Sequence, residues 1–222
     1  MDKVGRITFG PPMVSATQLN ARSPRPTSLT WLKDIPIWEW IIPDGGCLDI
    51  DNCPDCWERN AHLERYGFAC EVFQKSHLLD FGCGIGYGTE MLVNAGNTVT
   101  GVDASDTALT IARERRGKYA QYVKPEAIWS EAKFLGIVTF EVIEHLDNPE
   151  EFLSWAAARC KHIVISTPIV PTMKNNPHHK HDFTQSQFRG MVDKLFRIQS
   201  EWVQIRPWKL EPSYMVMHGA TR

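Results

Sequence analysis

The chain has 222 residues, a length typical of one large domain or of a domain with an extension. Apolar residues make up 43% and charged residues 23%, which excludes disordered, collagen-like and fibrous proteins. A formal net charge of −2 gives the whole chain no general attraction to nucleic acid or to an anionic membrane.

The sequence also predicts where the protein works. No apolar run approaches the roughly 20 residues that span a bilayer, and residues 1–20 lack the apolar segment of a secretory signal. The six cysteines are scattered through a chain that is not small, which favours free thiols in a reducing compartment. We therefore expect a cytoplasmic protein with no membrane partner.

The N-terminal part differs from the rest of the chain. Six of the 14 prolines lie in residues 1–45, where they oppose regular helices and central strands. A group of tryptophans in or beside this segment predicts a lid or added core packing, or else an apolar acceptor pocket; its members are Trp31, Trp38, Trp40 and Trp57. We expect an extension or lid over 1–57 and a regular domain over 58–222.

Regular elements begin at Glu58, where apolar residues recur at helical spacing through Phe73. Alternating strands and helices follow, and this order predicts an α/β fold with a Rossmann-like, doubly wound, mostly parallel sheet of seven strands. The last two strands have no helix between them, so the last strand should be antiparallel. Strands are expected over 76–81, 98–102, 120–124, 135–140, 162–166, 200–205 and 214–218, and helices over 87–95, 105–117, from 149, and 184–195.

A glycine-rich stretch, Asp80-Phe81-Gly82-Cys83-Gly84-Ile85-Gly86, follows the first predicted strand. The dinucleotide fingerprint G-x-G-x-x-G fails in both registers, because its sixth position is Tyr87 or Thr89. The Lys-Ser/Thr of a P-loop is also missing. A carboxylate from Asp80 at the mouth of the loop would repel a pyrophosphate, and it would suit a ligand that carries an ammonium and a sulfonium.

A second acid supports this interpretation. Asp103 ends the next strand, 21 residues after Gly82, at the distance where an acid accepts hydrogen bonds from ribose hydroxyls. Glu126 follows the third strand, where the adenine edge would lie. Taken alone, Asp103 could instead cap the following helix.

These motifs resemble a known family. Residues 60–200 are similar to class I S-adenosylmethionine-dependent methyltransferases of the broad bacterial type, which includes ubiquinone-pathway O-methyltransferases and many small-molecule or sugar methyltransferases. The resemblance rests on the glycine-rich stretch and on Arg65-Tyr66-Gly67-Phe68-Ala69, Val102-Asp103-Ala104-Ser105, Phe140-Glu141-Val142-Ile143-Glu144-His145-Leu146, Ile165-Ser166-Thr167-Pro168, Asn176-Pro177-His178 and Asp182-Phe183-Thr184.

The resemblance implies S-adenosylmethionine as cofactor and a set of residues that bind it. Asp80, Gly82, Cys83, Gly84 and Gly86 would line its methionine part, and Asp103 would hold the ribose, with Ala104 beside it. Glu126 and Ala127 would flank the adenine, and Phe140 and Glu141 would lie under the reacting methyl group. The family's usual acid in the fourth strand is replaced by Phe134-Leu135-Gly136, and its Pro-Gly-Gly turn before the fifth strand is missing.

The groups that would perform chemistry allow three interpretations. Glu141, Glu144 and His145 are spaced i, i+3, i+4, so one helical turn presents them together. With His181 they form a candidate set of ligands for a divalent metal, which is possible but not expected. Alternatively His145 or His181 acts as a general base, or these residues only anchor a turn.

A Cys53-x-x-Cys56 motif raises the question of zinc. A structural zinc site needs four ligands at paired spacing, and Cys47, His62 and Cys70 are poorly placed as the others. Buried thiols in an acidic loop are the favoured alternative.

The sequence thus predicts a methyltransferase that acts on an oxygen, nitrogen or carbon of a small molecule or sugar. One alternative is a metal-dependent RNA 2′-O-methyltransferase, suggested by eight bases against four acids in residues 172–222. The other is a non-catalytic module that binds S-adenosylmethionine, suggested by the missing fourth-strand acid.

Overall fold

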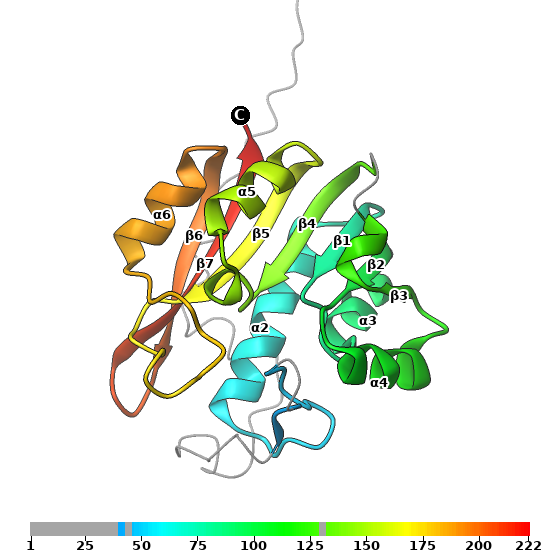
Figure 1. The fold of residues 1–222 in the computed structure, drawn as a ribbon, viewed down its shortest axis with the longest axis horizontal. Coiled ribbons are helices and arrows are strands. Elements are labelled where there is room, and N and C mark those ends of the chain that lie inside the picture. The colour runs from blue at the N-terminus through cyan, green and yellow to red at the C-terminus, as the bar shows by residue number, and fades with distance from the viewer. Residues whose placement is uncertain (1–39, 43–45, 129–131) are drawn as a thin grey trace, which may run out of the picture.

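The computed structural model describes residues 40–42, 46–128 and 132–222, so most of the predicted extension, with Trp31 and Trp38, lies outside the described residues. Within these ranges, seven strands form one sheet in the order β3-β2-β1-β4-β5-β7-β6 (Figure 1). Strand β7 is antiparallel to both of its neighbours and the others are parallel, as predicted. The strands are β1 (His77–Phe81), β2 (Thr98–Val102), β3 (Gln121–Val123), β4 (Phe134–Phe140), β5 (Cys160–Pro168), β6 (Phe196–Arg206) and β7 (Glu211–Thr221).

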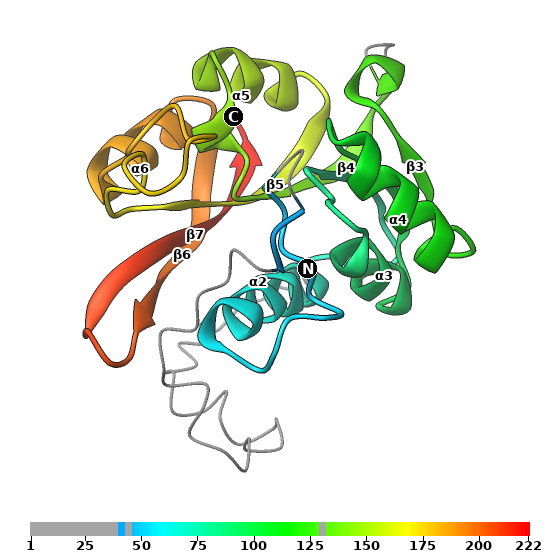
Figure 2. The same cartoon turned by 60° about the horizontal axis from the view of Figure 1, so that its bottom comes forward.

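Helices cover both faces of this sheet. Helices α5 (Pro149–Ala157) and α6 (Gln185–Asp193) pack on one face, and α2 (Trp57–Val72) and α3 (Tyr87–Asn94) pack on the other (Figure 2). Helix α4 (Asp106–Arg116) packs beside β3. None of the helices in the described ranges is long and apolar enough to cross a membrane.

The central strands β1, β4 and β5 are buried on both faces, because most of their successive side chains are apolar. Leu79 packs with the core under α5 and α6, whereas its neighbour Leu78 packs with the core under α2 and α3. Ile137 and Val138 in β4 divide in the same way. Successive side chains of a strand point to opposite faces, so such runs are typical of parallel sheets covered by helices on both sides.

Side-chain caps fix the starts of three helices, and each helix begins within one residue of the predicted start. Ser105 accepts a hydrogen bond from Ala108 at the start of α4, and Asn148 accepts one from Glu151 at the start of α5. Thr184 and Gln187 form a reciprocal capping box at α6. Each cap stabilises its helix by about 1 kcal/mol.

The C-terminal hairpin is longer than predicted. Strands β6 and β7 pair antiparallel along almost their whole lengths, with irregularities at two places. Helix α6 ends at Asp193, and β6 begins at Phe196, which is fully buried. Residues 196–199, Phe196-Arg197-Ile198-Gln199, alternate apolar and polar side chains, so a strand signal was present there that the prediction did not use.

The described part of the predicted extension packs against the domain. Ile41 and Leu48 form an isolated β-bridge, and the segment that follows is held to α4 by ion pairs. The guanidinium of Arg115 lies 3.1 Å from the Asp49 carboxylate and 2.7 Å from that of Asp51. These contacts hold residues 46–56 beside the glycine-rich loop.

Candidate functional site

A large cleft lies beyond the carboxyl ends of β1, β2, β4 and β5 and has a volume of about 1870 Å³. Strand order reverses between β1 and β4, and in open α/β sheets such a switch point is where ligands bind. The predicted site residues that line this cleft are Gly82, Cys83, Gly84, Asp103, Ala104, Phe140, Glu141 and His145. Eight predicted residues from the ends of β1, β2 and β4 therefore converge on one cavity.

The glycine-rich loop turns sharply at the end of β1. Gly82 has φ +82° and Gly84 has φ +53°, a backbone conformation that favours glycine. The amides of Gly82 and Cys83 both donate to the carbonyl of Val102, at 2.7 and 2.9 Å. A Cβ at Gly82 would lie 2.1 Å from Cγ2 of Val142, so glycine is required for space as well.

Asp103 is half-buried at the end of β2 and organises this loop. Its carboxylate accepts hydrogen bonds from the backbone amides of Gly84 and Ser105, both at 2.8 Å. The side chain that caps α4 is Ser105, so Asp103 is not the helix cap that the alternative interpretation suggested.

Asp80 lies in the interior rather than at the mouth of the loop, where the sequence analysis placed it. Its side chain is fully buried, and its oxygens accept hydrogen bonds from the hydroxyls of Tyr66 at 3.0 Å and Thr89 at 2.6 Å. Burial raises the pKa of this carboxyl to about 7, although both hydroxyls oppose the shift. The Asp80 side chain points into the core because both faces of β1 are covered by helices.

This pKa gives a prediction about stability. An acid whose pKa is higher in the folded than in the unfolded protein binds more protons when folded, so stability falls as pH rises from about 4 to about 7. We expect Asp80→Asn to lose less stability than the wild type between pH 5 and pH 7.5 in urea unfolding. An equal loss in both proteins would contradict this assignment.

Besides Asp80, three more of the predicted cofactor-binding residues lie outside the lining of the cleft. Gly86 begins α3 with φ +82°, and a Cβ there would lie 2.7 Å from the hydroxyl of Tyr122. Glu126 and Ala127 are exposed on a 3₁₀ turn, η3 (Pro125–Ile128). Because β3 is only three residues long, the chain turns at Pro125, and Pro125 lines the cleft instead.

The two acids after β4 are held by hydroxyls from β5. Glu141 has φ +56° and accepts a hydrogen bond from Ser166 at 2.8 Å. Glu144 lies on a 3₁₀ turn, η4 (Ile143–His145), and accepts a hydrogen bond from the hydroxyl of Thr167 at 3.0 Å. Its other oxygen, Oε1, is buried with no hydrogen-bond partner in the described chain. Burial raises the pKa of both carboxyls.

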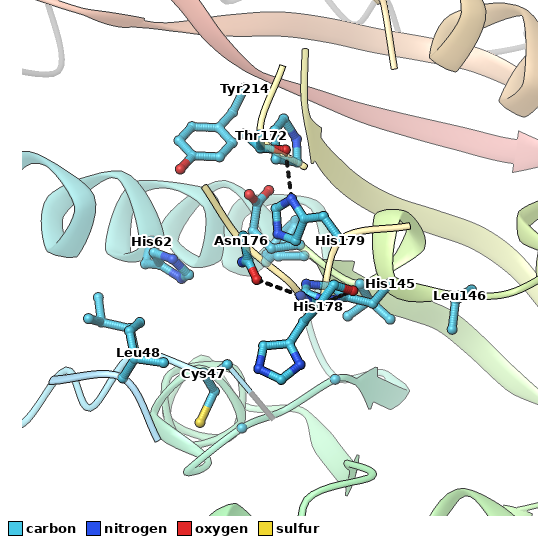
Figure 3. A pocket seen from close by; sticks show the side chains of 18 of the residues that line it. Cys47, Leu48, His62, His145, Leu146, Thr172, Asn176, His178, His179 and Tyr214 are labelled. Atoms are coloured by element: carbon cyan, nitrogen blue, oxygen red, sulfur yellow. Dashed lines mark hydrogen bonds between the residues drawn. The ribbon is translucent and has the colours of Figure 1, made fainter. Parts of the chain in front are cut away.

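Two histidines lie beside Glu144. Nδ1 of His145 is 3.0 Å from the carbonyl of His178, and the ring of His179 is 4.5 Å from that of His145 (Figure 3). Ligand atoms of Glu144, His145 and His179 all lie within 4.8 Å of one another. The structure therefore groups three side chains that could hold a divalent ion, and two of them, Glu144 and His145, belong to the predicted set of ligands.

His181 does not belong to this group, although the sequence analysis named it as both a candidate base and a candidate ligand. Its Nε2 lies 2.9 Å from the carbonyl of Leu146, and its ring stacks on Phe183, away from the cleft. His179 takes its place, and Glu141 is not among the grouped ligands. Spacing within a long loop does not determine which of several histidines faces inward.

The Cys53-x-x-Cys56 motif forms a buried pair. The two sulfurs are 3.6 Å apart, and all six cysteines of the chain are free thiols. Burial raises the pKa of Cys53 to about 12, which keeps it protonated. No third histidine, cysteine or acid joins the pair within the residues that the structure describes.

Aromatic and basic residues that the sequence analysis did not assign to the site also line the cleft. His62 and Tyr66 lie one turn apart on α2, and Tyr214 from β7 stacks on the buried Trp57 at 5.5 Å. The i, i+4 spacing of His62 and Tyr66 was a usable signal, since it places both on one face of the helix.

The family profile described as "Methyltransferase domain" matches residues 61–205, more than half of the chain. The chain belongs to the class I S-adenosylmethionine-dependent methyltransferases. The family resemblance stated from sequence is thereby confirmed, and S-adenosylmethionine is the cofactor of this methyltransferase domain.

Sequence relatives include ubiquinone biosynthesis O-methyltransferases. The one from Paramagnetospirillum magneticum is 35% identical over 106 residues, which cover 46% of this chain and 43% of the relative. The one from a Caulobacter species is 39% identical over 107 residues, covering 44% and 41%. The chain thus spans less than half the length of these curated relatives.

Solved structures show the same fold. A Pyrococcus horikoshii protein superposes with a TM-score of 0.63 at 13% identity, over 78% of this chain and 94% of that one. Magnesium protoporphyrin IX methyltransferase from Synechocystis, solved with bound SAH, superposes with a TM-score of 0.62 at 14% identity, over 74% and 85%.

The residues present fit S-adenosylmethionine. The glycine-rich loop brings backbone close to the cleft, and a Cβ at Gly84 would already lie 3.1 Å from Cβ of Cys47. Carboxylates are the acceptors that ribose hydroxyls need, and Asp103 supplies one at the edge of the loop. The cleft also exceeds the 300–1,000 Å³ or so of a typical small-molecule site, which leaves room for a second substrate.

Proposed function

We propose that the protein transfers a methyl group from S-adenosylmethionine to an oxygen atom of a small hydroxylated molecule. The observation that carries this proposal is one continuous cleft with two chemically different halves. One half holds the glycine-rich loop and Asp103, and the other holds Glu141, His145 and His179. The O-methyltransferase relatives support oxygen as the acceptor atom.

Each half has its own task in this proposal. Asp103 binds the ribose hydroxyls, and the backbone of Gly82 to Gly84 lies along the methionine part. When bound, S-adenosylmethionine supplies an electrophilic methyl group for in-line displacement. Phe140 and Glu141 border the reacting position, where alignment provides much of the rate enhancement.

His145 is the proposed general base. A carbonyl oxygen only accepts hydrogen bonds, so Nδ1 of His145 must donate to the His178 carbonyl, which leaves the lone pair on Nε2. Burial lowers the pKa of His145, so the ring is neutral near pH 7 and can take a proton from a hydroxyl.

The proposed partners and location follow from the same features. We propose a small-molecule or sugar acceptor, and the free thiols support a reducing compartment such as the cytoplasm. We propose that the predicted extension, residues 1–57, serves as a lid, because Cys47 and Leu48 line the cleft beside the cofactor half.

Transfer of a labelled methyl group tests this function. The purified protein is incubated with methyl-labelled S-adenosylmethionine and a panel of phenols, catechols and sugars, and products are examined for O-methyl groups. A labelled O-methyl product supports the proposal. Cofactor binding without transfer to any acceptor would favour the non-catalytic module instead.

A second candidate is a metal-assisted O-methyltransferase, favoured by the group formed by Glu144, His145 and His179. The unpartnered Oε1 of Glu144 is buried beside two imidazoles, and this donor set suits Mg²⁺, Mn²⁺ or Zn²⁺. A bound ion lowers the pKa of a coordinated hydroxyl. Vicinal hydroxyls of a catechol or of an RNA 3′ end would both be suitable acceptors, and in this version His145 is a ligand rather than a base.

If this second candidate is right, we expect Mn²⁺ to raise the melting temperature, because an ion that binds the folded protein stabilises it. His179→Ala should remove this shift, because the variant lacks one of the ligands. His181→Ala is the matched control, since this ring lies outside the group, and it should leave the shift unchanged. Equal shifts in all three proteins, or activity that is indifferent to a chelator, would contradict the metal site.

A further inference from the structure

A histidine and a tyrosine meet at the edge of the cleft beside the glycine-rich loop. His62 projects from α2 into the cleft, opposite the loop that carries His178 (Figure 3). Tyr87 is the first residue of α3 and directly follows Gly86. Nδ1 of His62 and the hydroxyl oxygen of Tyr87 are 2.7 Å apart.

The protons in this contact can be assigned. Burial raises the pKa of the Tyr87 hydroxyl above its usual range, so the hydroxyl keeps its proton. Within the described residues, Nδ1 of His62 is its only hydrogen-bond acceptor. Tyr87 therefore donates to Nδ1, and a neutral imidazole must then carry its own proton on Nε2.

The imidazole is neutral because of its surroundings. Burial, followed by the positive charge of Arg65, lowers the pKa of His62 well below its usual range. His62 thus presents an N–H donor to the cleft, and it lacks the free lone pair that a base needs.

Arg65 adds a fixed positive charge behind this donor. Its side chain is fully buried, with one nitrogen 2.6 Å from Oε1 of Gln204 and the guanidinium 4.6 Å from the centre of the Tyr214 ring. Its Nε and Nη2 have no hydrogen-bond partner in the described chain. An N–H donor in front of a buried cation favours an anionic oxygen.

We propose that Nε2–H of His62, oriented by Tyr87, binds the carboxylate of the methionine half of S-adenosylmethionine. This inference rests on the proposed function. Asp103 lies on the β2 side of the glycine-rich loop, whereas His62 and Tyr87 lie where the loop enters α3. A cofactor whose ribose contacts Asp103 and whose chain follows the loop reaches His62 with its amino-acid end. An anionic acceptor is the other possible source of such an oxygen, and the experiment separates the two.

Calorimetric titration with S-adenosylmethionine and with its decarboxylated analogue tests the proposal. We expect His62→Ala to weaken S-adenosylmethionine about tenfold or more, the effect of losing a hydrogen bond to a charged group, while the affinity for the analogue changes less than about twofold. His62→Gln, whose amide can replace Nε2–H, should recover most of the affinity. Tyr87→Phe should weaken S-adenosylmethionine selectively but less.

A spectroscopic measurement is independent of binding. The ¹⁵N shifts of His62 in the ligand-free wild type should report the Nε2–H tautomer, and Tyr87→Phe should shift the population toward Nδ1–H. Equal weakening of both ligands, no weakening of either, or a wild-type Nδ1–H tautomer would overturn the proposal. A wild-type protein that shows the Nε2–H tautomer and binds neither ligand would overturn the proposed function itself.

Discussion

Asp103→Ala is expected to abolish measurable binding of S-adenosylmethionine. The carboxylate holds the amides of Gly84 and Ser105, and in the proposed complex it also accepts from the ribose. Hydrogen bonds to a charged group contribute about 1.5–3 kcal/mol each. Losing the two bonds that the ribose hydroxyls donate to this carboxylate therefore lowers the affinity by roughly a hundredfold or more. The rise in melting temperature that S-adenosylmethionine gives the wild type should disappear with it.

Asp106→Ala is the matched control for this variant. Asp106 is also a carboxylate near the start of α4, but its side chain is 84% exposed and forms an ion pair with Lys124, at 3.1 Å. Exposed pairs contribute little, so the control should bind S-adenosylmethionine like the wild type. If Asp103→Ala and Asp106→Ala both kept the full ligand-induced shift, Asp103 would not be the ribose-binding residue.

Gly82→Ala is expected to damage both the fold and the cofactor half of the cleft. The residue has φ +82°, and the added Cβ would lie 2.1 Å from Cγ2 of Val142. A side chain in this backbone region costs about 1–2 kcal/mol, and forced overpacking costs about 1–3 kcal/mol more. We expect urea unfolding to show a loss of at least about 2 kcal/mol, together with loss of S-adenosylmethionine binding.

Gly190→Ala separates this effect from a general sensitivity to alanine. Gly190 lies inside α6, its φ is not positive, and nothing lies within 4 Å of a Cβ built there. Alanine in a helix interior is favoured over glycine by about 0.5–1 kcal/mol, so this variant should gain stability. If Gly82→Ala were as stable as the wild type, the loop would not be held in the conformation described.

The fold could be predicted from sequence because its local signals agree with one another. Asn148 followed by Pro149, and Thr184 three residues before Gln187, begin helices where they were expected to. The strand at 98–102 has the predicted bounds. The hairpin was predicted too short, because the alternating residues 196–199 were not assigned to the strand, although they pair with β7.

The site was only partly predictable. The glycine-rich loop and Asp103 have a fixed spacing along the chain, and both line the cleft. Asp80 points inward because β1 is covered on both faces. His179, rather than the predicted His181, lies beside Glu144 and His145, and this depends on how a long loop folds. His62 lies far from the loop in sequence, and only packing of α2 beside α3 brings it to Tyr87.

Calorimetric titration of the wild-type protein with S-adenosylmethionine tests the central claim most directly. One site per chain is expected, half-saturated at about 1 µM to 1 mM S-adenosylmethionine, the range in which Michaelis constants usually lie. Absence of binding heat and of any rise in melting temperature at millimolar S-adenosylmethionine would contradict it.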